Sequence, residues 1–515
     1  MIRDPLIAAT LALTGCTTTS STPTIRDAET RAWWALTSAL SSDAMEGRDT
    51  GSPGYDRAAA FVADRFRAAG LNPAGEGGSF FQPIRMRDVR VDEGRTLFEL
   101  VGDDGKIRPL RFLHDLTISA AAALPATIDA PLSFRGYCRP SDLVNIRGKV
   151  AVCFNARRAG VTTGAERVAA ATAAGAAGVI QIDDPSFTVE PPRWPVAYAR
   201  AVTPSGAPPS ASGPALPVMR YNPEALTQLL VGSGRDATTL LSAGGRGEPL
   251  TSFDVPARLR AKIATRSAEI LSANVLALLP GTDPNLRDEY LVLGAHLDGY
   301  GYGTPINGDG LYNGTFDDAA YVATLLRLAE QRGGRGFRRS ILFAVFTGEE
   351  KGLIGSRWLI ANPPVPRKAL VGMINLDQLR PIFPLDILTV HALQDTSLGQ
   401  AARDVASATN VRARLDPEPE RNLISRADHW PFLQADIPAV NFVFGYEPGT
   451  DAERRYRLWY QTRYHHPADD LSQPWNPEAA AKMNEFFYRF TASVADGDAR
   501  PTFLNPNPHR APATP

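Results

Sequence analysis

The residues best suited to chemistry in this chain are histidines and carboxylates that follow apolar runs of strand length. His296, Asp377 and the neighbouring Glu349 and Glu350 follow three separate runs of this kind, which cover 290–295, 370–376 and 340–346. Open α/β sheets bind ligands at the carboxyl ends of their strands, so we expect these side chains to meet at one edge. Imidazole nitrogen and carboxylate oxygen are zinc ligands, and the expected chemistry is therefore metal-assisted.

Four further polar residues could contribute to such a site. Asp317 and Asp318 come just before a helix-like segment; capping the helix needs only one of them, which leaves the other free to face the site. His465 lies in a polar loop and not on an apolar face, which disfavours a packing role. Asp298 comes two residues after His296, where it could hold the second nitrogen of that imidazole.

The elements that must position these residues alternate between strand and helix. From residue 274 onward, the three runs and a fourth at 439–444 alternate with helix-like segments at 319–330 and 477–494. This alternation predicts an α/β fold with a mostly parallel central sheet covered by helices on both faces. Nearer the N-terminus, apolar spacing predicts a helix over 56–69, which Gly70 would close.

The middle of the chain differs in composition. Residues 125–250 are rich in Ala, Gly and Pro, and we expect a second, smaller unit there because 515 residues exceed one ordinary domain. Strands are predicted at 149–153 and 178–182, on either side of a helix near 166–174. The Pro-rich stretch 191–217 indicates a surface loop. The Pro-rich tail 501–515 is expected to be disordered.

Charge excludes one class of partner. The 54 basic and 55 acidic residues nearly balance, which argues against nucleic acid as the main partner because such proteins present a basic face. A hydrophobic fraction of 44% and a charged fraction of 21% are typical of a globular protein. Beyond the N-terminal segment, the sequence has no apolar run long enough for a membrane helix.

The N-terminus indicates export. Residues 1–15 combine Arg3 with a short apolar stretch at 6–14, as in a signal peptide, and end at a motif, Leu-Thr-Gly-Cys16, that resembles the lipobox of bacterial lipoproteins. That resemblance implies cleavage before Cys16 and its lipidation, with residues 16–24 as a Thr/Ser-rich tether. The protein would then be anchored in the bacterial cell envelope, at the outer membrane or in the periplasm, and would contact the membrane only through its lipid. An ordinary signal peptide with an incidental cysteine is the alternative.

Two other cysteines, Cys138 and Cys153, remain in the chain. In an oxidising compartment they could form a disulfide, but two buried free thiols fit the sequence equally. Two cysteines cannot build a zinc site alone, so any metal centre must rely on histidine and carboxylate ligands.

Six motifs resemble, in order and spacing, those of the M28 peptidases, the family of the co-catalytic zinc aminopeptidases. They are Ala295–Asp298, Tyr312–Asp318, Thr347–Leu353 with Gly355 and Ser356, Asn375–Asp377, Arg426–Phe432, and Tyr464 with His465. The opening segments Glu46–Arg48 and Gly51–Gly54 also look like the family's usual start. Residues 147–149 and 173–178 are similar to the protease-associated (PA) domain that is often inserted in these enzymes.

The resemblance implies a di-zinc peptidase with a three-layer, zinc exopeptidase-like fold. It places His296 and Asp377 on one zinc ion and Glu350 and His465 on the other, with Asp317 bridging both. Glu349 would be the general base for hydrolysis of a peptide substrate. The peptidase domain would comprise 25–124 and 251–500, interrupted by a β-rich PA-like domain at 125–250. That domain would either cover the cleft as a lid or limit the access of large substrates.

Several positions depart from the family pattern. Asp318, Ala319, Ala320 and Tyr321 stand where Asn, Ala, Ser and Gly are common after the bridging aspartate, and Ala427 and His466 also differ from the usual residues. No ligand position is affected, so the departures bear on pocket shape. His429 and Tyr464 either line the pocket near the oxyanion or pack in the interior.

Four activities remain open on the sequence alone. The family favours an aminopeptidase that removes N-terminal residues. A carboxypeptidase or dipeptidase would need a cation for the substrate carboxylate, for which Arg380, Arg421 and Arg426 are candidates. The intact ligand set disfavours a metal-free binding module. The PA-like insert is unusual in an aminoacyl cyclase of this fold.

Overall fold

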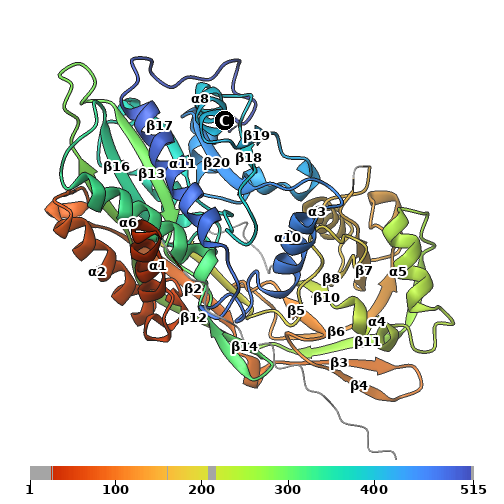
Figure 1. Ribbon diagram of the computed structural model, residues 1–515. Helices are drawn as coiled ribbons and strands as arrows, with labels where there is room; N and C mark the ends of the chain where they lie inside the picture. Colours follow the sequence, from red (N-terminus) through yellow and green to blue (C-terminus); the bar gives the residue numbers. More distant parts are fainter. Residues whose placement is uncertain (1–24, 26, 159, 207–215, 512–515) are drawn as a thin grey trace, which may run out of the picture.

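The computed structural model describes residues 25, 27–158, 160–206 and 216–511 (Figure 1). The predicted signal peptide, Cys16 and the tether lie outside the described residues. Within the described part of the chain, no helix combines the length and the apolar character needed to cross a membrane.

A large mixed sheet forms the core of the first unit. In spatial order its strands are β19 (Arg412–Arg414), β18 (Ile387–His391), β20 (Ala439–Phe444), β17 (Leu370–Asn375), β13 (Tyr290–His296), β16 (Ser340–Phe346), β12 (Thr265–Leu279), β2 (Phe81–Val91) and β9 (Arg200–Pro204), with β1 (Asn72–Pro73) beside β12. The strands β20, β17, β13 and β16 are parallel, whereas β18 and β12 join this centre antiparallel. The predicted α/β fold is confirmed, with a sheet that is parallel at its centre and mixed towards its edges.

Helices cover both faces of this sheet because its central strands are apolar on both sides. In β13, Leu291 and Leu293 pack into the cluster formed by one set of helices, while Val292 packs into the cluster on the opposite face. The first face carries α1 (Ala28–Leu40), α2 (Pro53–Ala68), α6 (Ala320–Arg332), α8 (Ser397–Ala408) and α11 (Pro477–Ala495). The opposite face carries α7 (Ile354–Ala361) and α9 (His429–Gln434). Figure 1 shows α1, α2 and α6 together beside β13 and β16.

The predicted helix over 56–69 begins three residues earlier, at Pro53. Ser52 caps it by accepting a hydrogen bond from the backbone N–H of Tyr55, and Pro53 fits the first helical position, where its missing N–H is not needed. The helix ends as predicted before Gly70, which has a φ of 77°.

A second sheet defines the insert unit, which comprises residues 97–262 except β9. Its strands are, in spatial order, β4 (Ile107–Leu110), β3 (Leu97–Gly102), β11 (Phe253–Lys262), β6 (Thr127–Phe134), β7 (Val150–Asn155), β8 (Gly178–Asp183), β10 (Val218–Tyr221) and β5 (Leu116–Ile118). Its helices are α3 (Gly164–Ala173), α4 (Leu226–Leu229) and α5 (Ala237–Arg246). The predicted boundaries of 125 and 250 were too narrow, because β3, β4 and β5 precede the compositional change. β3 and β5 pair with strands distant in sequence, and β4 pairs with β3.

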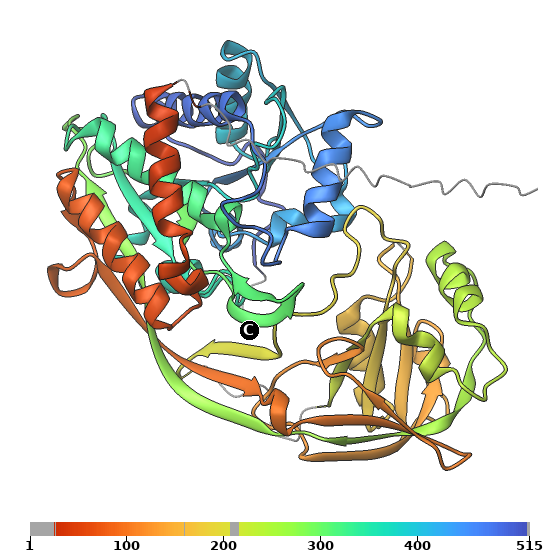
Figure 2. The ribbon, with the colours of Figure 1, turned by 60° about the horizontal axis from the view of Figure 1, so that its bottom comes forward.

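The two units are joined by the long antiparallel strands β2 and β12, which pair from Phe81 with Val275 to Val91 with Thr265. Figures 1 and 2 show this ribbon running from the large sheet towards the insert unit. β9 adds to the outer edge of β2. The prediction of a loop throughout 191–217 was therefore wrong at β9, where backbone pairing with β2 overrides a Pro-rich context.

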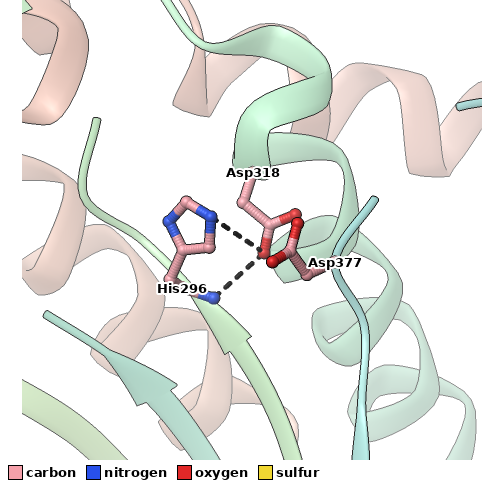
Figure 3. Close-up of side chains that lie close together, drawn as sticks. All are labelled: His296, Asp318 and Asp377. Atoms are coloured by element: carbon pink, nitrogen blue, oxygen red, sulfur yellow. Dashed lines mark hydrogen bonds and ion pairs between the residues drawn. The ribbon is translucent and has the colours of Figure 1, made fainter. Parts of the chain in front are cut away.

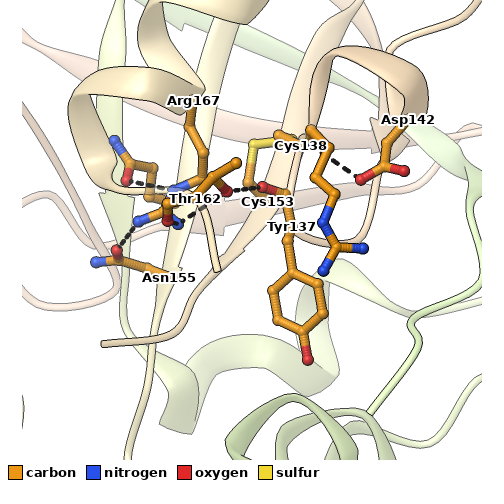
Figure 4. Close-up of a disulfide and its surroundings, with 9 residues drawn as sticks. Tyr137, Cys138, Asp142, Cys153, Asn155, Thr162 and Arg167 are labelled. Carbon is orange, nitrogen blue, oxygen red and sulfur yellow. Dashed lines mark hydrogen bonds between the residues drawn. A yellow bond between two sulfur atoms is a disulfide. The ribbon is translucent and has the colours of Figure 1, made fainter. Parts of the chain in front are cut away.

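Cys138 and Cys153 form a disulfide, which resolves the two alternatives that the sequence left open (Figure 4). Their Cα atoms are 5.5 Å apart, and both side chains are fully buried. The bond ties the turn after β6 to β7 inside the insert unit.

The predicted disorder of the tail was wrong for residues 501–511. Phe503 forms a β-bridge with Thr396, and the His509 imidazole lies 3.0 Å from the Asp395 carboxylate. The backbone N–H of Ala511 donates to the carbonyl of Gln434. Residues 512–515 lie outside the described residues.

Candidate metal centre

Five segments deliver polar side chains to one edge of the large sheet. His296 is the last residue of β13, the Glu349–Glu350 pair lies in the turn after β16, and Asp377 comes two residues after β17. Asp317 lies in a short turn that precedes α6, and His465 follows α10 (Asp451–Thr462). In the parallel pairing of β13 with β16, His296 lies opposite Phe346. His296 and the turn that carries Glu349 and Glu350 are therefore at the same edge of the sheet.

The carboxylate of Asp317 lies between two imidazoles. Its Oδ1 is 3.3 Å from the Nε2 of His296, and its Oδ2 is 3.2 Å from the Nε2 of His465. The Oε1 of Glu350 is also 3.2 Å from the Nε2 of His465. Asp317 therefore has the position of a carboxylate that could bridge two cations.

The possible ligand atoms form overlapping groups. Asp317, Glu350 and His465 bring one such atom each within 4.8 Å of the others, and so do His296, Asp318 and Asp377. A third group, His296, Glu349 and Glu350, shares a residue with each of them. Figure 3 shows the second group, with the carboxylates of Asp318 and Asp377 directed towards the His296 ring. The structure thus brings together all five residues predicted as metal ligands.

The surroundings of these atoms fit a pair of divalent cations. The Oδ2 of Asp317 and the Oε1 of Glu350 are buried without a hydrogen-bond partner, although buried polar atoms are normally hydrogen-bonded. The site also gathers several carboxylates that are at most 8% exposed, which is unfavourable unless positive charge offsets them. Nitrogen and oxygen donors of this kind suit zinc.

Glu349 is placed for proton transfer. Its Oε2 lies 4.0 Å from the Nε2 of His296, and its side chain is only 8% exposed. Burial raises the pKa of Glu349 well above its ordinary value; the nearby His296 opposes this shift, and the negative charge of Glu350 adds to it. Such a group can accept and return a proton closer to neutral pH than an exposed glutamate can.

Asp298 lies next to the second nitrogen of His296, as predicted, and the contact is made by its backbone. The Nδ1 of His296 lies 2.9 Å from the backbone carbonyl oxygen of Asp298, whereas the nearest carboxylate oxygen is 3.9 Å away. The carboxylate instead accepts hydrogen bonds from the Thr50 hydroxyl and from the backbone N–H of Glu349, each at 3.0 Å. Asp298 therefore fixes the turn that carries the base, and its backbone orients the imidazole.

Two further residues lie at the site: Asp318, which the sequence offered as an alternative to Asp317, and Tyr300, which it did not indicate. Asp318 is fully buried and accepts a hydrogen bond from the backbone N–H of His296 at 3.0 Å; it does not cap α6, which has no side-chain cap. Burial raises the pKa of Asp318 well above its ordinary value. The Tyr300 hydroxyl lies 3.0 Å from the Nδ1 of His465. The Asp-Asp pair was a usable signal for Asp318, but a tyrosine in a Gly-rich loop gave none.

The two predicted pocket residues lie in different places. The Tyr464 ring packs against the His465 ring with centroids 3.7 Å apart. His429 instead stacks on His391 at 5.7 Å, and both of its ring nitrogens are buried without a hydrogen-bond partner. His429 does not line the hollows that adjoin His465.

The three arginines considered for substrate binding are engaged in internal contacts. Arg380 donates to Gln378 and Tyr460. Arg421 donates to Tyr456 at 2.8 Å, and Arg426 forms a two-pronged pair with Glu190 of the insert unit at 2.8 and 3.0 Å.

Comparisons with known proteins agree with this geometry. Residues 274–491 match the model of peptidase family M28. The leupeptin-inactivating enzyme 1 of Streptomyces exfoliatus is 29% identical over 207 residues, which cover 39% of this chain and 43% of that protein. A probable zinc metalloprotease of Pyrenophora teres f. teres is 28% identical over 243 residues, which cover 45% of this chain and 50% of that protein. These matches thus span about half the length of the curated relatives or less.

Solved structures share the fold over almost the whole chain. The aminopeptidase from Aneurinibacillus sp. strain AM-1 has a TM-score of 0.60 at 17% identity, covering 94% of this chain and 98% of that one. The zinc aminopeptidase BSAP from Bacillus subtilis has a TM-score of 0.59 at 19% identity, covering 92% and 96%. The likeness extends across the insert unit, because it covers far more than the residues of the large sheet.

Proposed function

We propose that the chain is a di-zinc aminopeptidase, on the premise that residues 274–491 match the model of peptidase family M28. The observation that carries the proposal is the position of the Asp317 carboxylate, whose two oxygens approach the Nε2 atoms of His296 and His465 at 3.3 and 3.2 Å. A carboxylate so placed suits two ions about 3.5–4 Å apart.

The remaining ligands divide between the two ions. His296 and Asp377 would hold one, and Glu350 and His465 the other, with Asp317 shared. When bound, the ions supply Lewis acidity that lowers the pKa of water and polarises the scissile carbonyl. Tyr300 and the backbone carbonyl of Asp298 orient the two imidazoles through their Nδ1 atoms.

Glu349 performs the proton transfers. Its carboxylate accepts a proton from the attacking water and returns it to the nitrogen of the leaving amine. Its backbone N–H is held by the Asp298 carboxylate at 3.0 Å, which limits the movement of the turn during catalysis. Tyr464 packs against His465, and its hydroxyl accepts a hydrogen bond from Arg426 at 3.3 Å.

Two observations support exopeptidase action at the N-terminus. Relatives of the matched domain include the leucine aminopeptidase 1 of Trichophyton rubrum, which is 31% identical over 126 residues covering 23% of this chain and 32% of that protein. The carboxylates around the centre would also attract a substrate ammonium group. Carboxypeptidase action is less supported, because Arg426 is paired with Glu190, and Arg380 and Arg421 are at most 4% exposed.

The test compares aminoacyl-nitroanilides with the same compounds carrying an N-acetyl group, using protein loaded with zinc. We expect hydrolysis of the free-amine series only, and none after chelation or in Glu349→Gln. Cleavage restricted to the acetylated series would reject aminopeptidase activity. Zinc content is measured on the same samples, so that an inactive but metal-loaded protein is recognised.

We also propose that the protein is a lipoprotein of the bacterial envelope, on the basis of the Leu-Thr-Gly-Cys16 motif. Replacement of Cys16 by serine should release the protein from the membrane fraction, whereas replacement of Ser20 by alanine in the same segment should not. Membrane association that survives Cys16→Ser would rule out the lipid anchor.

A further inference from the structure

A cleft separates the insert unit from the metal centre. It has a volume of about 410 Å³ and is bordered on one side by Tyr300 and His465 of the centre. Its other side is formed by residues 190–198 and by the ends of β7 and β10. Figure 2 shows the segment between β8 and β9 reaching from the insert unit towards α10, and the carbonyl of Val189 accepts a hydrogen bond from Arg457 of that helix.

Three arginines of the insert unit line this cleft: Arg157, Arg193 and Arg220. Arg220 pairs with Asp183, and Arg193 lies 3.4 Å from Glu190. The solvent-exposed Arg157 has neither a hydrogen bond nor an ion pair with any described residue, and its guanidinium lies over the Phe187 ring at 5.3 Å.

The acids within reach do not offset these charges. Glu190 lies within ion-pair distance of Arg426, Arg421 and Arg193. Asp183 is engaged by Arg220. The cleft therefore carries an excess of positive charge, with one guanidinium that has no acidic partner among the residues described.

The positively charged side of the cleft lies close to the metal centre. The Arg193 guanidinium sits 4.6 Å above the Tyr464 ring, and that ring is 3.7 Å from the His465 ring. A group bound beside Arg193 and Arg157 could thus belong to a peptide whose N-terminal residue reaches the ions.

We propose that Arg157, together with Arg193 and Arg220, binds a carboxylate of the peptide substrate in this cleft. Arginine suits this role because its planar guanidinium donates two parallel hydrogen bonds to one carboxylate. The proposal rests on the peptidase function and adds a substrate class to it. The carboxylate comes either from the C-terminus of a very short peptide or from an acidic side chain near the N-terminus of a longer one.

This arrangement gives the insert unit a role in selectivity. A substrate that carries a carboxylate in the cleft gains contacts with cations from a unit that contributes none of the predicted metal ligands. Of the three arginines that the sequence offered for such a role, Arg380 and Arg421 are buried and Arg426 is paired with Glu190.

The experiment compares substrate pairs that differ in one carboxylate. Leucyl-alanine against leucyl-alanine amide tests the terminal carboxylate, and leucyl-glutamate amide against leucyl-glutamine amide tests an acidic side chain. In the wild-type protein we expect kcat/KM to be about ten-fold or more higher for the carboxylate member of one pair. In Arg157→Ala that ratio should fall towards one, and in Arg157→Lys it should be partly retained.

Arg258→Ala is the matched control, because Arg258 is an exposed arginine of the same unit, paired with Asp129 away from the cleft lining. It should keep the wild-type ratio. The pair that responds identifies the source of the carboxylate. A wild-type ratio near one for both pairs, or a ratio unchanged in Arg157→Ala, would overturn the proposal. Failure of the peptidase function itself would instead appear as no hydrolysis of any member.

Discussion

Glu190 of the insert unit forms an ion pair with Arg426, which lies beside the metal centre. Replacing Glu190 by glutamine tests how much this contact between the two units contributes to stability. The Glu190 side chain is 3% exposed, and its carboxylate contacts Arg426 at 2.8 Å, Arg193 at 3.4 Å and Arg421 at 3.7 Å. Arg426 also donates to the Tyr464 hydroxyl at 3.3 Å. Glutamine keeps the size of the side chain but removes the negative charge that these guanidinium groups share.

The expected loss of stability follows from burial. Removing one partner of a buried ion pair costs about 3–5 kcal/mol, because it leaves an uncompensated charge. Since the glutamine oxygen can still accept a hydrogen bond, we expect a value of about 3 kcal/mol at neutral pH. For a chain of 515 residues, this corresponds to a fall in Tm of roughly 3 °C.

The same reasoning predicts a pH dependence. Burial alone would raise the pKa of Glu190, but the Arg426, Arg193 and Arg421 guanidinium groups lower it far more, and the net pKa lies well below its ordinary value. A depressed folded pKa contributes stability that is present above the unfolded pKa, about 4.5, and is lost as pH falls below it. The difference between wild type and Glu190→Gln should therefore be full at pH 7 and shrink from about pH 4.5 downwards.

Thermal unfolding measured across this pH range is the assay, with Glu248→Gln as control. Glu248 pairs with Arg246 in the same unit, but the two side chains are 49% and 60% exposed, so solvent screens the pair and its loss should leave Tm almost unchanged. Equal Tm values for the two variants at pH 7 would refute the reasoning. If the stability difference between wild type and Glu190→Gln does not diminish in acid, the Glu190 charge is not its cause.

Three further predictions concern the centre and the disulfide. Glu349→Gln should retain bound zinc yet lose at least about 100-fold in kcat, and loss of zinc in this variant would mean that Glu349 is a ligand. Tyr300→Phe should weaken zinc binding by about 10- to 100-fold in a chelator competition, because the Nδ1 of His465 loses its hydrogen-bond partner. An unchanged zinc affinity would show that Tyr300 does not orient His465 for binding. Replacing Cys138 and Cys153 together by serine should lower the free energy of unfolding by about 3 kcal/mol, as expected for a 15-residue loop, and a reductant should reproduce this effect only in the wild type.

The central strands, and the polar site residues that follow them, were predictable from the sequence. The apolar run predicted at 340–346 coincides with β16, and the run predicted at 290–295 falls one residue short of β13. Such strands are buried on both faces, so hydrophobicity alone marks them, and the polar residue that follows each one is conspicuous. The grouping of His296, Asp377 and Glu350 followed from this pattern together with the family resemblance.

What the sequence did not reveal depends on contacts between distant residues. The insert unit extends to β3 because this strand pairs with β11, more than 150 residues later, and composition does not record that pairing. The pairing of Glu190 with Arg426 crosses the two units and has no local signal. At Asp298 the residue was identified, but the choice between its carboxylate and its backbone carbonyl depends on the geometry of the turn.

The central claim is that Asp317 bridges two metal ions held between His296 and His465. Anomalous diffraction at the zinc edge, from crystals grown with zinc, tests it most directly. The predicted result is two peaks about 3.5–4 Å apart, one on each side of the Asp317 carboxylate. A single peak, no peak, or two peaks that do not share Asp317 would contradict the account.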